Sequence, residues 1–406
     1  MKWNKYKIVC VVFIAFIMLT GLSTAVINAK QIGYNMLIGY KDNLDEDASI
    51  LDKLRAIIAE CEDGMNEGYL FKNQGVNLYG GFQKLLGKRV VNDIDSSNNV
   101  IKLDNGYLSF YRSKRQDINN IAKNTKEFND WLKKHKIDFL YIQAPHKISK
   151  YENIEPQGIK NYNNDNADDY LKSISVSNVN NIDLRKLIED DGIEYSSMFF
   201  KTDHHWTPKS GLWAFGKIAK ELNSNYGFSI DKRLWDESNY DIKTYKECFL
   251  GSQGKRTGIY YGGLDDFDII TPKFKTDFEF KVESENIYKK GGFKETLLDL
   301  SKFGTGDYFN TWPYDTYTGG DHGLINITNK MNNDRKKILL IKDSFSCVLI
   351  PFLAEGCSSL DVIDLRKYDG ISLEEYIENN KPDIVITMYN PDAICKDNEM
   401  FNFFNK

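Results

Sequence analysis

The strongest hydrophobic pattern of the chain lies at its beginning. Three lysines within the first seven residues precede an almost unbroken apolar run from Ile8 to Leu22, which continues to Ile27. About twenty apolar residues are enough to cross a bilayer as a helix. Basic residues before the run favour a cytoplasmic N-terminus and an exported remainder. We therefore predict that residues 1–29 form an uncleaved signal anchor, although Ser23-Thr24-Ala25 also fits a cleavage site that would release a secreted protein.

Residues 30–115 predict a smaller part between the anchor and the main domain. Apolar residues recur at helical spacing from Glu46 to Glu62, which predicts an amphipathic stalk helix. Val100–Leu103 and Tyr107–Tyr111 have the pattern of two short strands. Asn105-Gly106 between them suits the left-handed positions of a tight hairpin turn. We expect the hairpin to lie as a layer on the main domain.

From residue 116 to residue 406 the pattern is that of an α/β domain. A helix from Asp117 to Lys136 leads into a buried strand at Ile137–Gln143, and Tyr195–Lys201 predicts another strand. Between residues 337 and 388 strand, helix, strand, helix and strand alternate, which predicts a parallel sheet flanked by helices. Residues 225–334 are irregular and too long for a loop, so we interpret them as a β-rich insertion that forms one wall of a cleft.

Composition limits the classes of function. The chain has 406 residues, of which 41% are hydrophobic, and a net charge of −5, so nothing suggests a nucleic-acid partner. A neutral or sugar-like partner fits this charge better. Five of the six cysteines lie outside the apolar run and show no C-x-x-C spacing, which indicates neither a disulfide framework nor a zinc site. A single disulfide bond stays open.

The first candidate for chemistry follows the strand predicted at residues 195–201. Thr207 has the character of an N-cap and Pro208 that of a first helical residue. Asp203 and His205 are two residues apart and can point the same way. The carboxylate then orients one imidazole nitrogen and leaves the other basic, ready to activate a hydroxyl or thiol from elsewhere. A polar loop that only caps the helix is the plainer interpretation.

The hydroxyl that this pair needs has a candidate in Ser344. It follows the strand that starts at Lys337, where a helix begins whose amides would stabilise an oxyanion. An N-cap without catalytic role is the alternative. Because turns at the carboxyl ends of parallel strands share one edge, we expect Ser344 to meet Asp203 and His205.

Asp203-His204-His205-Trp206 together with Asp343-Ser344-Phe345 resembles the DHHW proteins, relatives of the periplasmic alginate O-acetyltransferase proteins within the SGNH hydrolase class. The resemblance runs from about Ile118 to the end. It implies an SGNH hydrolase-like sheet and a triad with Ser344 as nucleophile, His205 as general base and Asp203 as orienting acid. It also implies transfer of an acetyl group to an exopolysaccharide. The order of the motifs is permuted, since Asp203 and His205 precede Ser344.

The chain departs from the SGNH pattern in two places. Lys342 stands where a glycine usually precedes the Asp-Ser pair, and Asn390 lacks the surrounding Gly-x-Asn-Asp signature. Asn390 is nevertheless the candidate oxyanion donor after the last strand. Trp206 and His322 are candidate substrate-binding residues, because aromatic faces suit sugar rings.

Taken together, these features predict a single-pass cell-membrane protein whose extracytoplasmic domain is a polysaccharide O-acetyltransferase. The polysaccharide would be the acceptor, and a membrane-bound O-acyltransferase would supply the acyl group, since acyl-CoA is cytosolic. We expect no cofactor.

Three alternatives remain at this stage. The same triad would make an acetylesterase if water resolved the acyl-enzyme, and a vestigial triad would leave an anchored glycan-binding or scaffold protein. A metal hydrolase would use Asp203, His204 and His205 with His146 or His322. We expect no metal, because adjacent histidines in an extended segment face apart.

Overall fold

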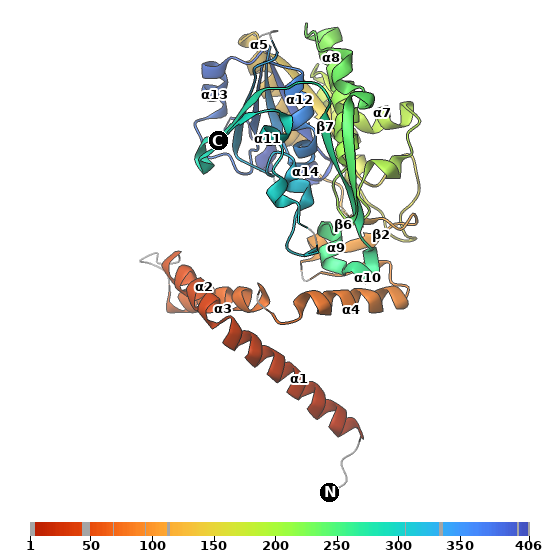
Figure 1. Ribbon diagram of the computed structural model, residues 1–406, viewed down its shortest axis with the longest axis vertical. Coiled ribbons are helices and arrows are strands. Elements are labelled where there is room, and N and C mark those ends of the chain that lie inside the picture. The colour runs from red at the N-terminus through yellow and green to blue at the C-terminus, as the bar shows by residue number, and fades with distance from the viewer. Residues whose placement is uncertain are drawn as a thin grey trace. The chain divides into compact units, whose positions relative to one another are not determined.

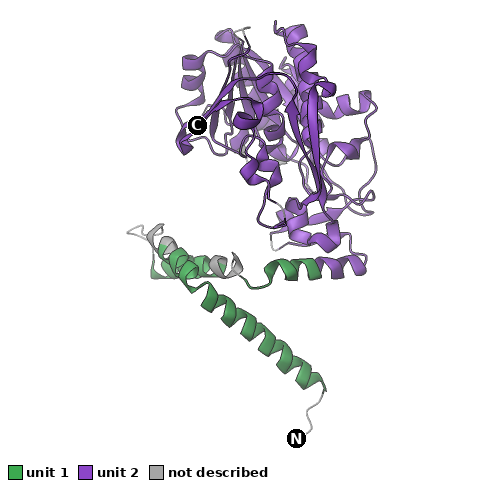
Figure 2. Cartoon of the chain, viewed as in Figure 1, with its two compact units in different colours: residues 1–78 green, residues 79–406 purple. Residues whose placement is uncertain are grey.

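The computed structural model describes residues 5–42, 49–67, 69–93, 95–111, 114–304, 306–332, 336–395 and 398–404. The chain forms two compact units, residues 1–78 and residues 79–406 (Figure 2). Helix α4 (Lys72–Leu85) crosses the boundary between them.

The first unit is helical. It contains α1 (Lys5–Ile27), α2 (Ala29–Asp42) and α3 (Ile50–Glu67). Among the described residues, α1 is the one helix long and apolar enough to cross a membrane, with a mean hydropathy of 2.5. Helix α3 corresponds to the predicted stalk helix, of which residues 46–48 lie outside the described residues. Helix α2 was not expected.

The second unit begins with a small antiparallel sheet. It consists of β1 (Val90–Val91), β2 (Val100–Lys102) and β3 (Leu108–Phe110), in that order. Gly106 joins β2 to β3 with a φ of 85°, the left-handed conformation that a glycine adopts without strain. The predicted hairpin is thereby confirmed.

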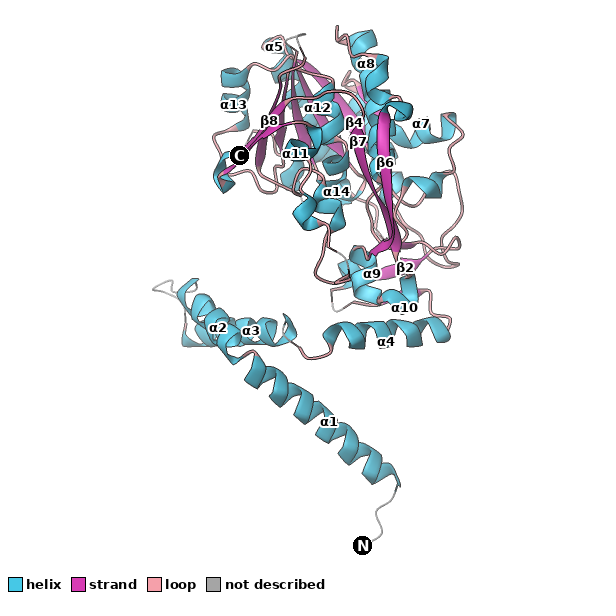
Figure 3. Ribbon diagram, viewed as in Figure 1, coloured by secondary structure: helices cyan, strands magenta, loops and turns pink. Residues whose placement is uncertain are grey.

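An eight-stranded sheet forms the centre of the second unit (Figure 3). Its order is β5-β4-β13-β11-β12-β10-β8-β9. Neighbours among the first five strands are parallel, whereas β10, β8 and β9 extend the sheet in antiparallel fashion. The strands are β4 (Asp138–Gln143), β5 (Asn181–Asp183), β8 (Phe278–Val282), β9 (Ile287–Gly291), β10 (Leu324–Asn329), β11 (Lys337–Lys342), β12 (Ser359–Ile363) and β13 (Ile384–Tyr389).

Two hydrophobic clusters sandwich this sheet, which explains why its central strands are apolar at nearly every position. Alternate side chains of a strand point to opposite faces. In β4, Leu140 and Ile142 therefore join one cluster, while Phe139 and Tyr141 join the other. The predicted α/β class is confirmed, with a mostly parallel sheet between helical layers (Figure 1).

Strands and helices alternate over residues 337–389 as expected, and the helix predicted before β4 is present as α5 (Asn119–Lys134). The other helices of the second unit are α6 (Asn163–Val176), α7 (Leu184–Asp190), α8 (Pro208–Asn225), α9 (Ser252–Thr257), α10 (Ile259–Gly262), α11 (Phe293–Leu297), α12 (Ile350–Glu355), α13 (Leu373–Asn380) and α14 (Asp392–Cys395). Short 3-10 helices include η2 (Tyr195–Met198), η7 (Pro313–Thr316) and η8 (Ser344–Val348).

Two expectations about elements were wrong in detail. The strand predicted at Tyr195–Lys201 is η2 followed by a loop. Its backbone bonds to the Asp265 carboxylate, to its own loop and, through the Lys201 carbonyl, to the Leu108 amide of β3. The region 225–334 contains β6 (Tyr240–Phe249) and β7 (Asp265–Pro272), which pair with each other. Three further strands from this region belong to the central sheet itself.

Candidate active site

The loop that holds Asp203 and His205 folds back on itself before α8. Phe199 pairs with Trp206 as an isolated antiparallel bridge, and the Thr207 amide donates to the Met198 carbonyl at 2.9 Å. Thr207 then caps α8 by accepting a hydrogen bond from the Ser210 amide, with Pro208 at the first position. The predicted cap is confirmed, and it fixes the end of the loop.

Asp265 on β7 fixes the beginning of the same loop. Its carboxylate accepts hydrogen bonds from the amides of Lys201 and Thr202, at 2.6 and 2.8 Å, and from the Thr202 hydroxyl. The Gly251 amide donates to that hydroxyl at 2.9 Å. This contact could not be predicted from the residue pattern, because Asp265 lies about sixty residues later, in the region expected to be irregular.

Asp203, His205 and Ser344 form a continuous chain of hydrogen bonds. The Asp203 Oδ1 lies 2.6 Å from the His205 Nδ1, and the His205 Nε2 lies 2.8 Å from the Ser344 Oγ. The Ser252 amide donates to the second carboxylate oxygen, Asp203 Oδ2, at 2.6 Å. Asp203 and His205 are buried and Ser344 is partly exposed, so Ser344 is the residue of these three that is most open to a substrate.

The carboxylate of Asp203 is charged. Burial by itself would raise the pKa of Asp203, but the nearby His205 and His204 and the hydrogen bonds from His205 and Ser252 hold it well below its usual range. Burial is the largest cause of the lowered pKa of His204, and the neighbouring His205 lowers it further. A charged Asp203 favours the tautomer in which His205 carries its proton on Nδ1 and accepts at Nε2.

Hydrogen bonds to the preceding residue, Asp343, fix the turn that carries Ser344. One oxygen of Asp343 accepts from the Phe345 amide at 2.9 Å, and the other accepts from both the backbone and side-chain amides of Asn390 at 2.7 Å. Burial raises the pKa of Asp343. Asn390 thus reaches the expected sheet edge and is hydrogen-bonded to the neighbour of Ser344. Its role as an oxyanion donor stays a prediction.

Tyr314 is a member of the site that the sequence reasoning missed. Its ring stacks on His205 with centroids 4.0 Å apart and an interplanar angle of 12°. Its hydroxyl donates to the carbonyls of Ser344 and Phe345, at 3.1 and 3.2 Å. One side chain therefore orients both the imidazole and the serine turn. The sequence shows that Tyr314 lies in a Tyr-rich stretch, but it does not show that its ring contacts His205.

The two candidate substrate-binding residues do not meet that expectation. Trp206 is fully buried and donates its indole N–H to the Phe345 carbonyl at 2.7 Å, which contradicts a contact with a sugar ring. His322 is also buried, with its ring nitrogens 2.6 Å from a Glu285 oxygen and 3.1 Å from the Thr318 carbonyl. Within the described residues, no hydrogen bond or ring contact joins His322 to Asp203, His205 or Ser344.

The expectation that His204 and His205 face apart was wrong, because the loop bends and is not extended. Their ring centroids are 3.7 Å apart, and ligand atoms of Asp203, His204 and His205 lie within 4.8 Å of one another. Both nitrogens of His205 are hydrogen-bonded, and the His204 Nδ1 lies 2.8 Å from the Ser252 Oγ. An ion bound through His205 would displace it from Asp203 or from Ser344.

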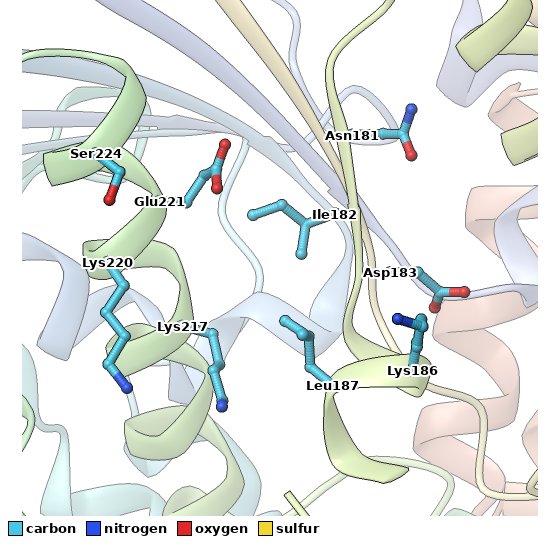
Figure 4. Close-up of a pocket in the computed structure, with 9 residues that line it drawn as sticks. All are labelled: Asn181, Ile182, Asp183, Lys186, Leu187, Lys217, Lys220, Glu221 and Ser224. Carbon is cyan, nitrogen blue, oxygen red and sulfur yellow. The ribbon is translucent and has the colours of Figure 1, made fainter. Parts of the chain in front are cut away.

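A separate pocket of about 460 Å³ lies between α7 and α8 (Figure 4). Charged side chains such as Lys186, Lys217 and Glu221 line it. None of its lining residues belongs to the hydrogen-bonded chain of Asp203, His205 and Ser344.

Comparison with solved structures shows the fold. PatB1 from Bacillus cereus matches with a TM-score of 0.61 at 20% sequence identity, over 75% of this chain and 99% of PatB1. PatB1 carrying a sulfonyl adduct matches with a TM-score of 0.62 and the same identity, over 78% of this chain and 100% of that one. A DHHW family protein from Eubacterium siraeum matches with a TM-score of 0.58 at 19% identity, over 78% and 99%. Each is similar in fold to the chain described above.

No curated protein sequence matches the chain. A family model does, over residues 104–363, which is more than half of the chain and includes both the loop of Asp203 and the turn of Ser344. The chain is a member of the DHHW protein family.

Proposed function

We propose that this chain is an extracytoplasmic O-acetyltransferase that acts on a cell-surface or secreted polysaccharide. The observation that carries the proposal is the unbroken hydrogen-bond chain from Asp203 through His205 to Ser344. Membership in the DHHW family, which resembles the alginate O-acetyltransferase proteins, supports the reaction class. On this proposal the domain is SGNH hydrolase-like with permuted motifs, and α1 anchors it in the membrane.

The chemistry follows from the atoms in contact. The His205 Nε2 accepts the Ser344 Oγ proton as that oxygen attacks the acyl carbonyl of the donor. The bond to the donor's leaving group breaks, His205 protonates that group, and Ser344 is left acylated. A sugar hydroxyl then gives its proton to His205 and attacks the ester. The bond between the acyl carbon and the Ser344 Oγ breaks, and His205 returns the proton to that oxygen.

Asp203 keeps His205 in the productive tautomer and stabilises the imidazolium that forms in each step. The developing oxyanion needs a donor, for which Asn390 is the candidate, because the amides of Phe345 and Ser346 already donate to Asp343. Loss of one such donor typically costs roughly 3 kcal/mol, or about a hundredfold in turnover. A membrane-bound O-acyltransferase is the proposed source of the acyl group.

The test is acetyl transfer by the full-length chain in detergent, from p-nitrophenyl acetate to a panel of oligosaccharides. We expect acetylated sugar from the wild type and none above background from Ser344→Ala. Ser346→Ala is the matched control, because its hydroxyl lies on the same turn, buried and without a hydrogen-bond partner among the residues that the structure describes. Free acetate without acetylated sugar would instead identify an esterase, and equal rates for wild type and Ser344→Ala would overturn the proposal.

A further inference from the structure

Within the second unit, the end of α4 packs through its glycine face. Gly80 is buried, and a Cβ atom there would lie 1.6 Å from the Thr257 carbonyl oxygen. The Tyr261 hydroxyl donates to the Lys88 carbonyl at 2.8 Å, just after the helix. Figure 1 shows this end of α4 beside α10. The side of the helix that bears Gly80 therefore faces the rest of the unit.

The other side of the same helix end is apolar and exposed. Tyr79, Phe82, Leu85 and Leu86 are 47%, 58%, 86% and 54% exposed. At 3.6 residues per turn these four positions fall within about a third of the helix circumference, nearly opposite Gly80. An exposed apolar stripe of this kind marks a surface that contacts a partner or a membrane.

A basic pocket of about 200 Å³ adjoins the end of the stripe. Lys84, Lys88, Arg89 and Lys102 line it together with one carboxylate, Asp104, which lies 2.7 Å from Arg89. Four cations against one anion leave an excess of three positive charges. Burial lowers the pKa of Lys102, and the neighbouring cations, Lys84 first, lower it further. An anion placed in the pocket would relieve this repulsion.

We propose that the apolar stripe and the basic pocket together form a docking surface for an anionic phospholipid bilayer. Tyr79, Phe82, Leu85 and Leu86 would enter the boundary between headgroups and acyl chains, and lipid phosphates would occupy the pocket. Two observations favour a bilayer over a second copy or another protein. Helix α1 is long and apolar enough to cross a membrane, and an apolar face flanked by cations is complementary to an anionic interface.

This inference rests on the membrane attachment in the proposed function and not on the chemistry at Ser344. It gives the second unit a membrane contact of its own, separate from α1. The unit's orientation at the bilayer would then be set by two attachments instead of one.

The test identifies the occupant directly. The full-length chain is placed in lipid nanodiscs with p-benzoylphenylalanine at position 82, or at position 176 as a control, since Val176 on α6 is 78% exposed. We expect light-dependent lipid adducts at position 82 and not at position 176, with a higher yield on phosphatidylglycerol than on phosphatidylcholine. Crosslinks from position 82 to the chain's own first unit or to a second copy, or equal lipid yields at both positions, would overturn the proposal.

Charge variants test the pocket. Lys84→Glu and Lys88→Glu should each lower the lipid-adduct yield on phosphatidylglycerol by about fivefold through the lost cation, and further through the added carboxylate. Lys186→Glu, on α7, is the matched control and should leave the yield unchanged. Unchanged yields in all three variants would overturn the proposal. Hydrolysis of p-nitrophenyl acetate in detergent should not change in any of them, which separates this inference from the proposed function.

Discussion

Gly251 is a residue whose replacement tests how Asp203 is held. A Cβ atom at this position would lie 2.2 Å from the Asp203 Cβ, 2.4 Å from its Cα and 2.6 Å from its backbone nitrogen. Real Cβ contacts essentially never fall below 3.0 Å. Because two of these neighbours are backbone atoms, no rotation of a side chain relieves the overlap. In Gly251→Ala the loop of Asp203 must move by roughly 1 Å.

The expected cost has two parts. Overpacking of this kind typically destabilises a protein by about 1–3 kcal/mol. A displacement of about 1 Å at a catalytic group typically costs about a hundredfold in rate. We therefore expect Gly251→Ala to melt at a lower temperature and to release p-nitrophenol from p-nitrophenyl acetate about a hundredfold more slowly while still folded.

The assay compares Gly251→Ala with Gly75→Ala, at constant enzyme concentration and below both melting temperatures. A Cβ at Gly75 meets nothing within 4 Å, and alanine in a helix is favoured over glycine by up to about 1 kcal/mol. Gly75→Ala should therefore be as active as the wild type and no less stable. Wild-type turnover and melting temperature in Gly251→Ala would refute the close packing of Gly251 on Asp203.

Three further predictions concern two residues of the site and one buried carboxyl group elsewhere in the second unit. Asp203→Asn should reduce turnover by about ten-thousandfold with little change in the KM for the ester, because His205 loses its orienting charge; a less than tenfold effect would contradict this. Tyr314→Phe keeps the ring on His205 and should slow turnover by less than about tenfold, whereas Tyr314→Ala loses both contacts and should slow it by about a hundredfold; equal rates in the two variants would argue against ring stacking. Burial raises the pKa of Glu355 to about 8, so the folded state keeps a proton that the unfolded state loses above pH 4.5. Between pH 5 and pH 8 the unfolding free energy of the wild type should therefore fall by on the order of 4 kcal/mol more than that of Glu355→Gln. An equal fall in the two proteins would contradict this.

The late alternation of strands and helices could be predicted because its strands are buried on both faces. A strand such as β13, Ile384–Tyr389, is apolar at nearly every position and is bounded by polar turns. The turn of Ser344 follows β11 directly, so its place at the sheet edge came with the strand. The hairpin around Gly106 was equally local, because its turn chemistry is written in two residues.

What could not be predicted depends on contacts between distant residues. Tyr195–Lys201 is rich in aromatics, as strands are, but Asp265 takes the amide of Lys201 that a neighbouring strand would otherwise bond. Helix α4 was missed because Gly75, Gly80 and Gly81 lower its helical propensity and its apolar side is not buried.

The candidate site was predicted in part for the same reason. Asp203, His205 and Ser344 could be singled out by residue type and spacing, since a triad needs those groups. Gly251 and Tyr314 carry no such signature: one contributes only the absence of a side chain, and the other only a ring at the right distance. Trp206 was misjudged because an aromatic next to a site can face the core as readily as a substrate.

The most direct test of the central claim is a peptide map of the covalent adduct. The full-length chain is treated with a sulfonyl fluoride, which labels activated serine hydroxyls, or quenched during turnover of p-nitrophenyl acetate. We expect one modified residue, Ser344, labelled rapidly in the wild type and at least a hundredfold more slowly in His205→Ala. Labelling elsewhere, or equal rates at Ser344 in both proteins, would contradict activation of Ser344 by Asp203 and His205.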